Sequence, residues 1–482
     1  METINQVLER FEQISSVPRG TKREQKISQW LQEWAKEHGF SSRSDSVGNL
    51  VIYVPASSGM EKAPTVILQG HMDMVCEKTP DSDHDFTRDP IRVIRDGDWL
   101  KADRTTLGAD NGIAIAIGLA LAEDKTASHP PLELLFTVEE EIGIGGASQL
   151  DPSMISGKTL VNLDSEEEGI FIVGCAGGKT TKIQLPVSRI EPANDDEVLS
   201  LFVDGLKGGH SGVDIHKHRA NANKVLGRAL DQTRRKIPIQ LGLLRGGTAH
   251  NAIPRSAEAV FTCPREMSAL CHEQVAQFEK QLQMEYAASD PGLKLHLTKA
   301  EDHRTHQVIK PAETEKVIHL LMAFPDGVAR MSPAIEGFVE ASNNLAVIEL
   351  VNSRLHLTSS QRSTVMSTLD ELTGQIEAIS HLAGAQFEHT DGYPAWQPNM
   401  DSPLLKRSVD VYEGLFHQKP EVKMIHAGLE CGIIGDRCGN MDMISLGPTI
   451  KNPHSPDEML YLPSVMRVWE FLRGLLETCK LT

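Results

Sequence analysis

Short runs of apolar residues alternate along this chain with longer stretches in which apolar residues recur about every three or four positions. Uninterrupted runs of about four to eight residues predict strands buried on both faces of a sheet, and the periodic stretches predict amphipathic helices. Toward the two ends of the chain, such runs occur at residues 50–54, 65–69, 132–137, 159–163 and 443–446. Helical patterns fall between several of them, for example from Ile27 through Trp34 to Gly39. The alternation predicts an α/β fold with a mainly parallel sheet flanked by helices.

The middle of the chain has a different pattern, in which strand-like runs alternate with polar amphipathic helices. The expected strands lie at residues 199–203, 239–244, 257–262, 293–297 and 345–357, and the expected helices at 220–236, 267–288 and 364–382. This mixture predicts an α+β insertion, and no internal repeat is apparent within it. We therefore expect a discontinuous domain of residues 1–185 and 399–482, and an inserted domain of residues 186–398 that can act as a lid.

The composition excludes several classes of protein. Apolar residues make up 40% of the 482 residues and charged residues 24%, which argues against a disordered or collagen-like chain. The net charge of −18 argues against nucleic acid as a partner, because phosphates require a basic surface. Neither a secretory leader nor an apolar run of bilayer length is apparent, so we expect a soluble cytoplasmic protein without a membrane partner. The seven cysteines form no C-x-x-C pair and predict no disulfide framework.

Residues that can bind metal ions lie directly beside the predicted strands. They are His71 and Asp73 after the run at 65–69, Glu140 and Glu141 after 132–137, Asp164 after 159–163, Asp110 before a long apolar stretch, and His454 after the last run. Open α/β sheets bind ligands at the carboxyl ends of their strands, so these side chains are expected to converge. Histidines and carboxylates without cysteine suit two zinc-class ions that share a bridging carboxylate and activate a water molecule. The sequence therefore predicts a metal-dependent hydrolase.

Seven short motifs follow one another in a specific order. They are His71-Met72-Asp73, Gly108-Ala109-Asp110-Asn111-Gly112, Glu140-Glu141-Ile142-Gly143, Asp164-Ser165-Glu166-Glu167-Glu168-Gly169, Gly208-Gly209-His210-Ser211-Gly212, His426-Ala427-Gly428-Leu429-Glu430-Cys431-Gly432 and His454-Ser455-Pro456-Asp457-Glu458. In this order, and over nearly the whole chain, they resemble the aminoacyl-histidine dipeptidases of the M20 metallopeptidase family. The resemblance implies a di-zinc catalytic domain with a lid, and hydrolysis of short unblocked peptides such as Xaa-His dipeptides.

The resemblance also implies a role for each candidate ligand. His71 would bind one metal ion and His454 the other, with Asp110 bridging the two. Glu141 would complete the His454 side and Asp164 the His71 side. Elementary chemistry agrees, because a bridging carboxylate can hold two ions roughly 3.5–4 Å apart and thereby lower the pKa of a shared water molecule.

Two carboxylates beside these ligands are expected to support catalysis. Asp73, two residues after the first histidine ligand, is placed to accept that ring's second N–H. In the triplet Glu139-Glu140-Glu141, the family pattern Glu-Glu-x-Gly, counted back from Gly143, makes Glu140 the general base and Glu141 the ligand. A base is required to move a proton from the water molecule to the leaving amine. Glu139 is surplus in this pattern and is expected to lie in a solvated loop.

In the insertion, the glycine-rich segment around His210 is not a phosphate-binding loop, because no Gly-Lys-Ser/Thr follows it. By resemblance, His210 would polarise the scissile carbonyl and stabilise the oxyanion. Asn251 would contact the same oxyanion. Arg362 would bind the substrate carboxylate, for which a guanidinium fork is well suited.

These observations together predict a cytoplasmic metallo-dipeptidase that acts on unblocked dipeptides, with the Xaa-His type preferred. Its cofactors are expected to be two divalent metal ions, Zn²⁺ first and Mn²⁺ or Co²⁺ as alternatives. The resemblance favours a homodimer formed through the inserted domain. An alternative within the family is another amide hydrolase, such as a tripeptide aminopeptidase or an N-acyl amino acid deacylase. Outside enzymes, a metal-bound peptide-binding protein would be expected to lack the base, and Glu140 argues against it.

Overall fold

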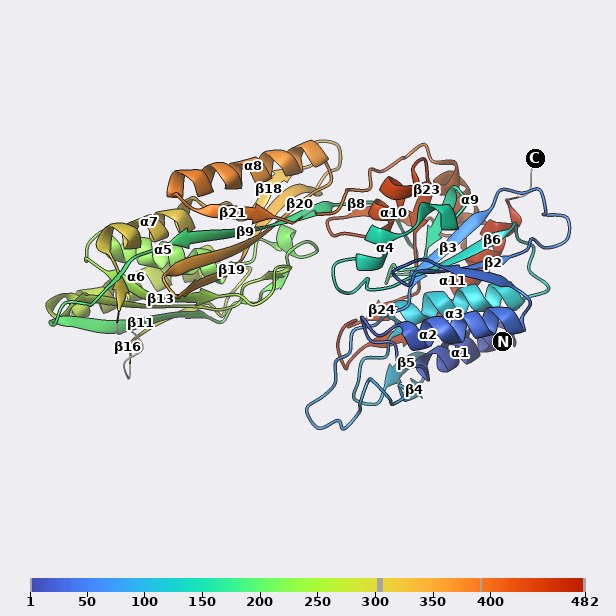
Figure 1. Ribbon diagram of the computed structural model, residues 1–482, viewed down its shortest axis with the longest axis horizontal. Coiled ribbons are helices and arrows are strands. Elements are labelled where there is room, and N and C mark those ends of the chain that lie inside the picture. The colour runs from blue at the N-terminus through green and yellow to red at the C-terminus, as the bar shows by residue number, and fades with distance from the viewer. Residues whose placement is uncertain (1, 301–306, 391, 480–482) are drawn as a thin grey trace. The chain divides into compact units, whose positions relative to one another are not determined.

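The computed structural model describes residues 2–300, 307–390 and 392–479, which divide into two compact units (Figure 1). Unit 1 contains Met1–Cys175, Trp396–Met424 and Leu429–Thr482, and unit 2 contains Ala176–Ala395 and Ile425–Gly428. The sequence predicted an inserted domain of residues 186–398, whereas the main segment of unit 2 is Ala176–Ala395. The first border comes earlier because residues 177–186 form a strand of the sheet of unit 2.

The centre of unit 1 is an eight-stranded sheet in the order β1-β2-β6-β3-β7-β23-β8-β22. Its strands are β1 Ser41–Ser44, β2 Leu50–Val54, β3 Val66–His71, β6 Leu132–Thr137, β7 Thr159–Asn162, β8 Ile170–Cys175, β22 Glu421–Ile425 and β23 Asp442–Ser445. The pairs β6–β3, β3–β7 and β7–β23 are parallel, whereas β1–β2, β2–β6 and β23–β8 are antiparallel. The α/β class is confirmed, and the sheet is mixed, with antiparallel as well as parallel pairs.

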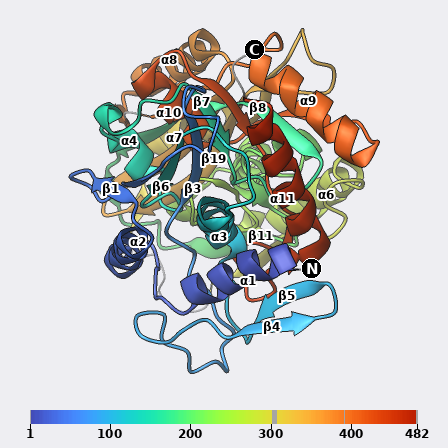
Figure 2. The ribbon, with the colours of Figure 1, turned by 90° about the vertical axis from the view of Figure 1, so that its right-hand side faces the viewer.

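Helices on this sheet bury their apolar sides in one shared core. They are α1 Glu2–Ser15, α2 Gln25–Glu37, α3 Ala109–Glu123, α9 Pro403–Phe416 and α11 Leu462–Glu477. Helix α1 contacts both α3 and α11 (Figure 2). Helix α3 is buried on every side from Ala109 to Leu121, which explains why this stretch is apolar all round rather than amphipathic.

Smaller elements complete unit 1. A four-stranded sheet has the order β24-β25-β5-β4, and α4 packs against α10. Their bounds, with the 3₁₀ turn η1, are β4 Val93–Asp96, β5 Trp99–Ala102, β24 Ile450–Lys451, β25 Met459–Tyr461, α4 Gly145–Gln149, α10 Glu430–Cys438 and η1 Pro152–Met154. No helix in the described part of the chain is both long and apolar enough to cross a membrane.

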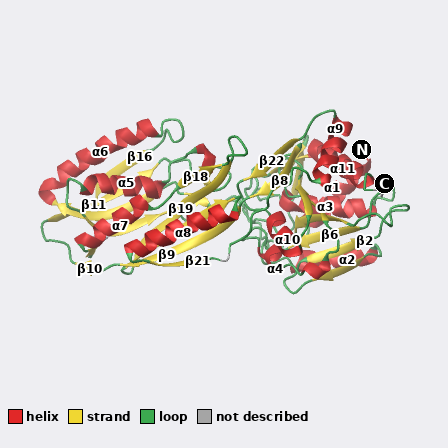
Figure 3. Ribbon diagram, turned by 90° about the horizontal axis from the view of Figure 1, so that it is seen from above, coloured by secondary structure: helices red, strands yellow, loops and turns green. Residues whose placement is uncertain are grey.

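Unit 2 contains two modules with the same β-α-β-β-α-β topology. The first consists of β11 Asp196–Asp204, α5 Ala222–Arg234, β13 Gln240–Gly246, β15 Ala257–Pro264, α6 Ser268–Glu285 and β16 Lys294–Lys299. The second consists of β9 Gly177–Pro186, α7 Pro311–Ala323, β19 Val339–Val351, β20 Arg354–Ser363, α8 Met366–Ala383 and β21 Gln386–His389. Their strands form one sheet in the order β16-β11-β15-β13-β19-β20-β9-β21, so the modules meet at their second strands, β13 and β19. Helices α5, α6, α7 and α8 all contact strands of this sheet (Figure 3). Unit 2 therefore contains the same topology twice.

One expected strand of the insertion is in fact two strands. The apolar run at 345–357 spans the hairpin of β19 and β20, because Asn352 and Ser353 have φ angles of 48° and 61°. Two successive residues with positive φ are the mark of a type I′ turn, which fits the twist of a tight hairpin. The remaining elements of unit 2 are β10 Arg189–Ile190, β12 Gly209–His210, β14 Ala252–Ile253, β17 Val308–Ile309, β18 Gly327–Met331, η2 Ile215–Lys217 and η3 Arg265–Met267.

Candidate metal centre

The candidate ligands of unit 1 lie at the ends of its elements. His71 is the last residue of β3, Glu141 follows β6, and Asp164 follows β7. Asp110 is in the first turn of α3, and His454 lies in the loop between β24 and β25. Because β6, β3 and β7 are parallel, their carboxyl ends share one edge of the sheet, and the side chains meet there.

The carboxylate of Asp110 lies between the two histidines. Its Oδ1 is 3.0 Å from Nε2 of His71, and its Oδ2 is 3.0 Å from Nε2 of His454. His71 Nε2 is also 3.4 Å from Asp164 Oδ1, and His454 Nε2 is 3.1 Å from Glu141 Oε2. The structure thus brings the five side chains together as two groups that share Asp110.

The donor atoms fit a pair of divalent ions. Ligand atoms around a tetrahedral zinc ion with bonds of about 2.0–2.1 Å lie about 3.3 Å apart, close to the separations between these histidines and carboxylates. His71, Asp110 and Glu141 offer donor atoms that all lie within 4.8 Å of one another. In addition, Glu141 Oε1 is buried and has no hydrogen-bond partner among the described residues. A buried carboxylate oxygen without a partner is costly unless a cation binds it.

The electrostatics of the cluster favour positive charge. Burial opposes a charge on His71, but the carboxylates of Asp164 and Asp110 outweigh burial and raise the pKa of His71 well above its usual range. Hydrogen bonds to Asp110 and Glu141 raise the pKa of His454 to about 11. Burial raises the pKa of Asp164 to about 6. Metal ions would supply the positive charge that the carboxylates otherwise draw from protons on the histidines.

Asp73 contacts both the first histidine and the acidic triplet. Its Oδ1 is 3.3 Å from Nδ1 of His71, the contact expected from the sequence. Its two carboxylate oxygens also accept the backbone N–H groups of Glu140 and Glu141, at 3.1 and 3.2 Å. Burial raises the pKa of Glu140 well above its usual range, which increases the affinity of this carboxylate for a proton. Asp73 therefore holds in place both a candidate ligand and the candidate base.

Two further carboxyl groups near the centre were not predicted from the sequence. Glu430, the first residue of α10, is fully buried, and its Oε2 accepts hydrogen bonds from Gln69 Nε2 at 2.6 Å and Thr137 Oγ1 at 2.8 Å. Burial raises the pKa of Glu430 to about 7. Burial and the charges of Asp110 and nearby acids raise the pKa of Glu166 to about 8. The only signal for either residue was its presence inside a motif that resembles the family.

In unit 2, the candidates His210 and Asn251 are neighbours. Strand β12, which contains His210, pairs with β14, and the N–H of Ser211 donates to the carbonyl of Asn251 at 2.8 Å. Nδ1 of His210 accepts the backbone N–H groups of Gly212 and Val213 at 3.2 and 3.1 Å. In the neutral ring the proton therefore lies on Nε2, which makes Nε2 a hydrogen-bond donor.

Arg362, on β20, lies in the same part of unit 2. Its Nη1 donates to the hydroxyl of Tyr393 at 2.7 Å, and its Nε is buried without a partner among the described residues. A Cβ atom on Gly212 would lie 3.1 Å from His210 Cε1 and 3.3 Å from Arg362 Nε. Burial and the charge of Arg362 lower the pKa of His426 to about 3, so this ring is neutral. Unit 2 thus gathers the three lid candidates, with His426 as an addition that was not predicted.

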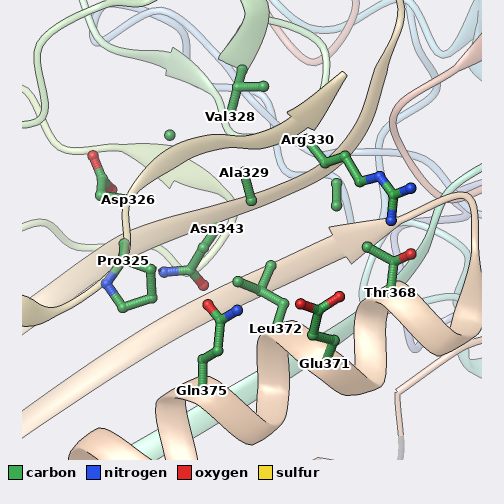
Figure 4. Close-up of a pocket in the computed structure, with 12 residues that line it drawn as sticks. Pro325, Asp326, Val328, Ala329, Arg330, Asn343, Thr368, Glu371, Leu372 and Gln375 are labelled. Carbon is green, nitrogen blue, oxygen red and sulfur yellow. Dashed lines mark hydrogen bonds between the residues drawn. The ribbon is translucent and has the colours of Figure 1, made fainter. Parts of the chain in front are cut away.

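A cavity of about 390 Å³ lies elsewhere in unit 2, beside β18 and α8 (Figure 4). Asp326, Arg330, Asn343 and Glu371 are among the residues that line it, and none of the candidate site residues appears in that described lining. Its volume suits a small molecule, but it contains neither the histidines nor the carboxylate cluster. The chemistry of the side chains, rather than the size of a cavity, identifies the candidate centre.

Known proteins are similar to this chain over nearly its whole length. Residues 203–290 match the model of the peptidase dimerisation domain of the M20 family. The chain is 39% identical over 467 residues to the cytosol non-specific dipeptidase of Escherichia coli strain K12. The aligned region covers 97% of this chain and 96% of that protein. The crystal structure of aminoacylhistidine dipeptidase from Vibrio alginolyticus has 40% identity and a TM-score of 0.85, covering 98% of this chain and 96% of that one.

A more distant structure shares the fold alone. Aminopeptidase PepT from Bacillus cereus is 15% identical, with a TM-score of 0.58 over 99% of this chain and 98% of its own. The dipeptidase from Escherichia coli is similar over nearly the whole length of both chains, which extends the relationship beyond the fold. The chain therefore belongs to the M20 family of metallopeptidases.

Proposed function

We propose that this protein is a metallo-dipeptidase that hydrolyses unblocked dipeptides, including those of the Xaa-His type. The observation that carries the proposal is the carboxylate of Asp110, whose two oxygens lie 3.0 Å from the Nε2 atoms of two histidines. The names of two relatives, a non-specific dipeptidase and an aminoacylhistidine dipeptidase, support the substrate class.

The two groups of ligands define the proposed cofactor sites. His71, Asp164 and Asp110 would hold one ion, and His454, Glu141 and Asp110 would hold the other. When bound, the two ions would activate a water molecule and polarise the scissile carbonyl as Lewis acids. Zinc suits these nitrogen and oxygen donors best, and manganese or cobalt are the alternatives.

The proposed proton transfers belong to Glu140. Its carboxylate would take the proton of the attacking water and deliver it to the nitrogen of the leaving amino acid. Asp73 would keep this carboxylate in place, because it binds the backbone N–H groups of Glu140 and Glu141. The same residue would fix the orientation of the His71 ring.

The lid candidates would bind the substrate. His210 would donate its Nε2 proton to the carbonyl oxygen as negative charge develops there, since the backbone N–H groups on Nδ1 fix the tautomer. Asn251 would support the same oxygen. Arg362 would bind the terminal carboxylate of a dipeptide, a role that suits its buried and unpartnered Nε.

The relatives support two further parts of the proposal. The match to the peptidase dimerisation domain supports a homodimer formed through unit 2. The name of the Escherichia coli relative supports a cytoplasmic location.

A hydrolysis profile tests the proposal. The purified protein, loaded with Zn²⁺, would be assayed with dipeptides of varied C-terminal residue, including Ala-His and β-Ala-His, and with tripeptides and N-acetyl amino acids as controls. We expect the highest kcat/KM on unblocked dipeptides, with Ala-His among the best substrates. Faster cleavage of tripeptides or N-acetyl amino acids would instead favour another amide hydrolase of the same family.

A further inference from the structure

A buried carboxylate beside Asp110 binds the backbone of its loop. Glu458 is 2% exposed, and its Oε2 accepts the N–H groups of Leu107 and Gly108 at 2.8 and 2.9 Å. Its Oε1 accepts the N–H groups of Ala109 and Asp110 at 2.8 and 3.2 Å. All four amides of this segment, including that of the bridging residue, are therefore bound by one side chain. An ionised carboxylate suits this position, because it accepts through both oxygens and lies at the positive end of α3.

A buried arginine binds backbone carbonyl groups of this loop and of the segment that follows His71. Arg19 is 2% exposed, and its Nη1 donates to the carbonyls of Met72 and Asp73 at 3.0 and 2.8 Å. Its Nη2 donates to the carbonyl of Gly108. These three bonds connect the segment that follows His71 with the loop that leads into Asp110.

The glycines of the Gly108–Gly112 motif leave room for this guanidinium. A Cβ atom on Gly108 or on Gly112 would lie 2.6 Å from Nη2 of Arg19, closer than real Cβ atoms approach other heavy atoms. The motif therefore requires glycine at both ends, because Arg19 occupies the space that a Cβ atom would need. Burial lowers the pKa of Arg19, while the charges of Glu458, Asp73 and Asp110 oppose that effect.

We propose that Glu458 and Arg19 are a pair of positioning residues that fix the relative positions of three ligand-bearing segments. Arg19 ties the His71 segment to the Asp110 loop, and Glu458, four residues after His454, ties the His454 segment to the same loop. The inference rests on the proposed metal-binding role of these segments. Neither side chain contacts the ligands' donor atoms in the contacts described, so both act through the backbone.

The chemistry of the two side chains makes specific substitutions informative. Glu458→Gln preserves size but replaces one acceptor oxygen by an amide nitrogen, which cannot accept from Leu107 and Gly108 or from Ala109 and Asp110. Arg19→Lys preserves the charge but replaces a planar fork by a single ammonium group, which cannot reach carbonyls of two segments in the same geometry. Removing groups that orient metal ligands typically costs about 10–100-fold in metal affinity.

The experiment compares Zn²⁺ affinity by competition with a chelator in the full-length protein. We expect Glu458→Gln and Arg19→Lys each to weaken binding by about 10–100-fold, and Glu458→Asp, which keeps the charge, to weaken it less than Glu458→Gln. Asp457→Asn is the matched control, because it removes the same charge from the adjacent exposed residue, and its affinity should stay unchanged. The visible spectrum of the Co²⁺-loaded protein should change in Glu458→Gln, since it reports ligand geometry, which a loss of stability alone would leave unaltered.

Wild-type Zn²⁺ affinity and a wild-type Co²⁺ spectrum in Glu458→Gln would overturn the proposal. If Glu458→Gln does not fold, Glu458→Asp and Arg19→Lys decide, and wild-type affinity in both would overturn it. Asp110→Ala separates this inference from the metal centre itself. If Asp110→Ala loses zinc while the folded positioning variants retain it, only the positioning role fails. If Asp110→Ala itself retains two equivalents of zinc, the proposed centre fails.

Discussion

Replacing Glu140 by glutamine should abolish most of the turnover and leave the metal centre assembled. The backbone N–H of Glu140 is bound by Asp73, so the loop should keep its conformation when only the side chain changes. Glutamine has the same size but cannot accept a proton at neutral pH. A general base typically contributes about 10²–10⁴-fold, equivalent to about 2.7–5.5 kcal/mol in activation free energy.

The neighbouring glutamates are the matched controls. Glu141 Oε2 lies 3.1 Å from His454 Nε2, so Glu141→Gln should weaken metal binding itself. Glu139→Gln should change little, because this residue is held by its backbone N–H rather than by its side chain. The assay is kcat and KM on Ala-His together with zinc content for all three variants. If Glu140→Gln loses zinc while Glu141→Gln retains it fully, Glu140 is the metal ligand. That result would refute the assignment of Glu140 as the general base.

Four further substitutions test separate parts of the account. Asp110→Ala should cost more bound zinc than removal of either histidine ligand, measured by metal analysis of purified protein, since it serves both ions. His210→Ala should spare zinc and lower kcat about 10²–10³-fold, and an unimpaired variant would contradict its role as donor. Arg362→Ala should act mainly on KM, with a smaller effect on amidated dipeptides, and equal losses on both substrates would exclude it. Burial raises the pKa of Asp326 to about 6, from an unfolded value of about 3.9. The protonated side chain therefore contributes stability in full below about pH 4, and this contribution is lost as the pH rises through about 6. Asp326→Asn should remove this pH dependence of the free energy of unfolding in urea, and an unchanged pH profile would contradict the role of Asp326.

Much of unit 1 was predictable because its central strands are simple. The run at 132–137 is uninterrupted and buried along its length, and it matches β6 residue for residue. Glu141 and Asp164 lie within a few residues of the ends of β6 and β7, so the end of each predicted strand located the candidate ligand. The family pattern ending at Gly143 assigned the order within the acidic triplet, and the distance from Glu141 to His454 is compatible with that order.

Other features could not be predicted from the sequence because they depend on long-range contacts with the backbone. Glu458 and Leu107 are 351 positions apart, and the contact between them involves a backbone N–H, which no side-chain pattern reveals. Arg19 similarly binds only carbonyl groups in the contacts described. The repeated topology of unit 2 was missed because β9 precedes the first module while the rest of the second module follows it. The turn at Asn352 was missed although the polar residues Asn352, Ser353 and Arg354 interrupt the apolar positions there.

The most direct test of the metal centre is a titration of the metal-free enzyme with Zn²⁺, followed by turnover of Ala-His at each step. We predict no turnover without metal, and a rise that reaches its plateau when two equivalents are bound, with no such plateau in Asp110→Ala. Full turnover of the metal-free protein, or a plateau at two equivalents in Asp110→Ala, would contradict the account.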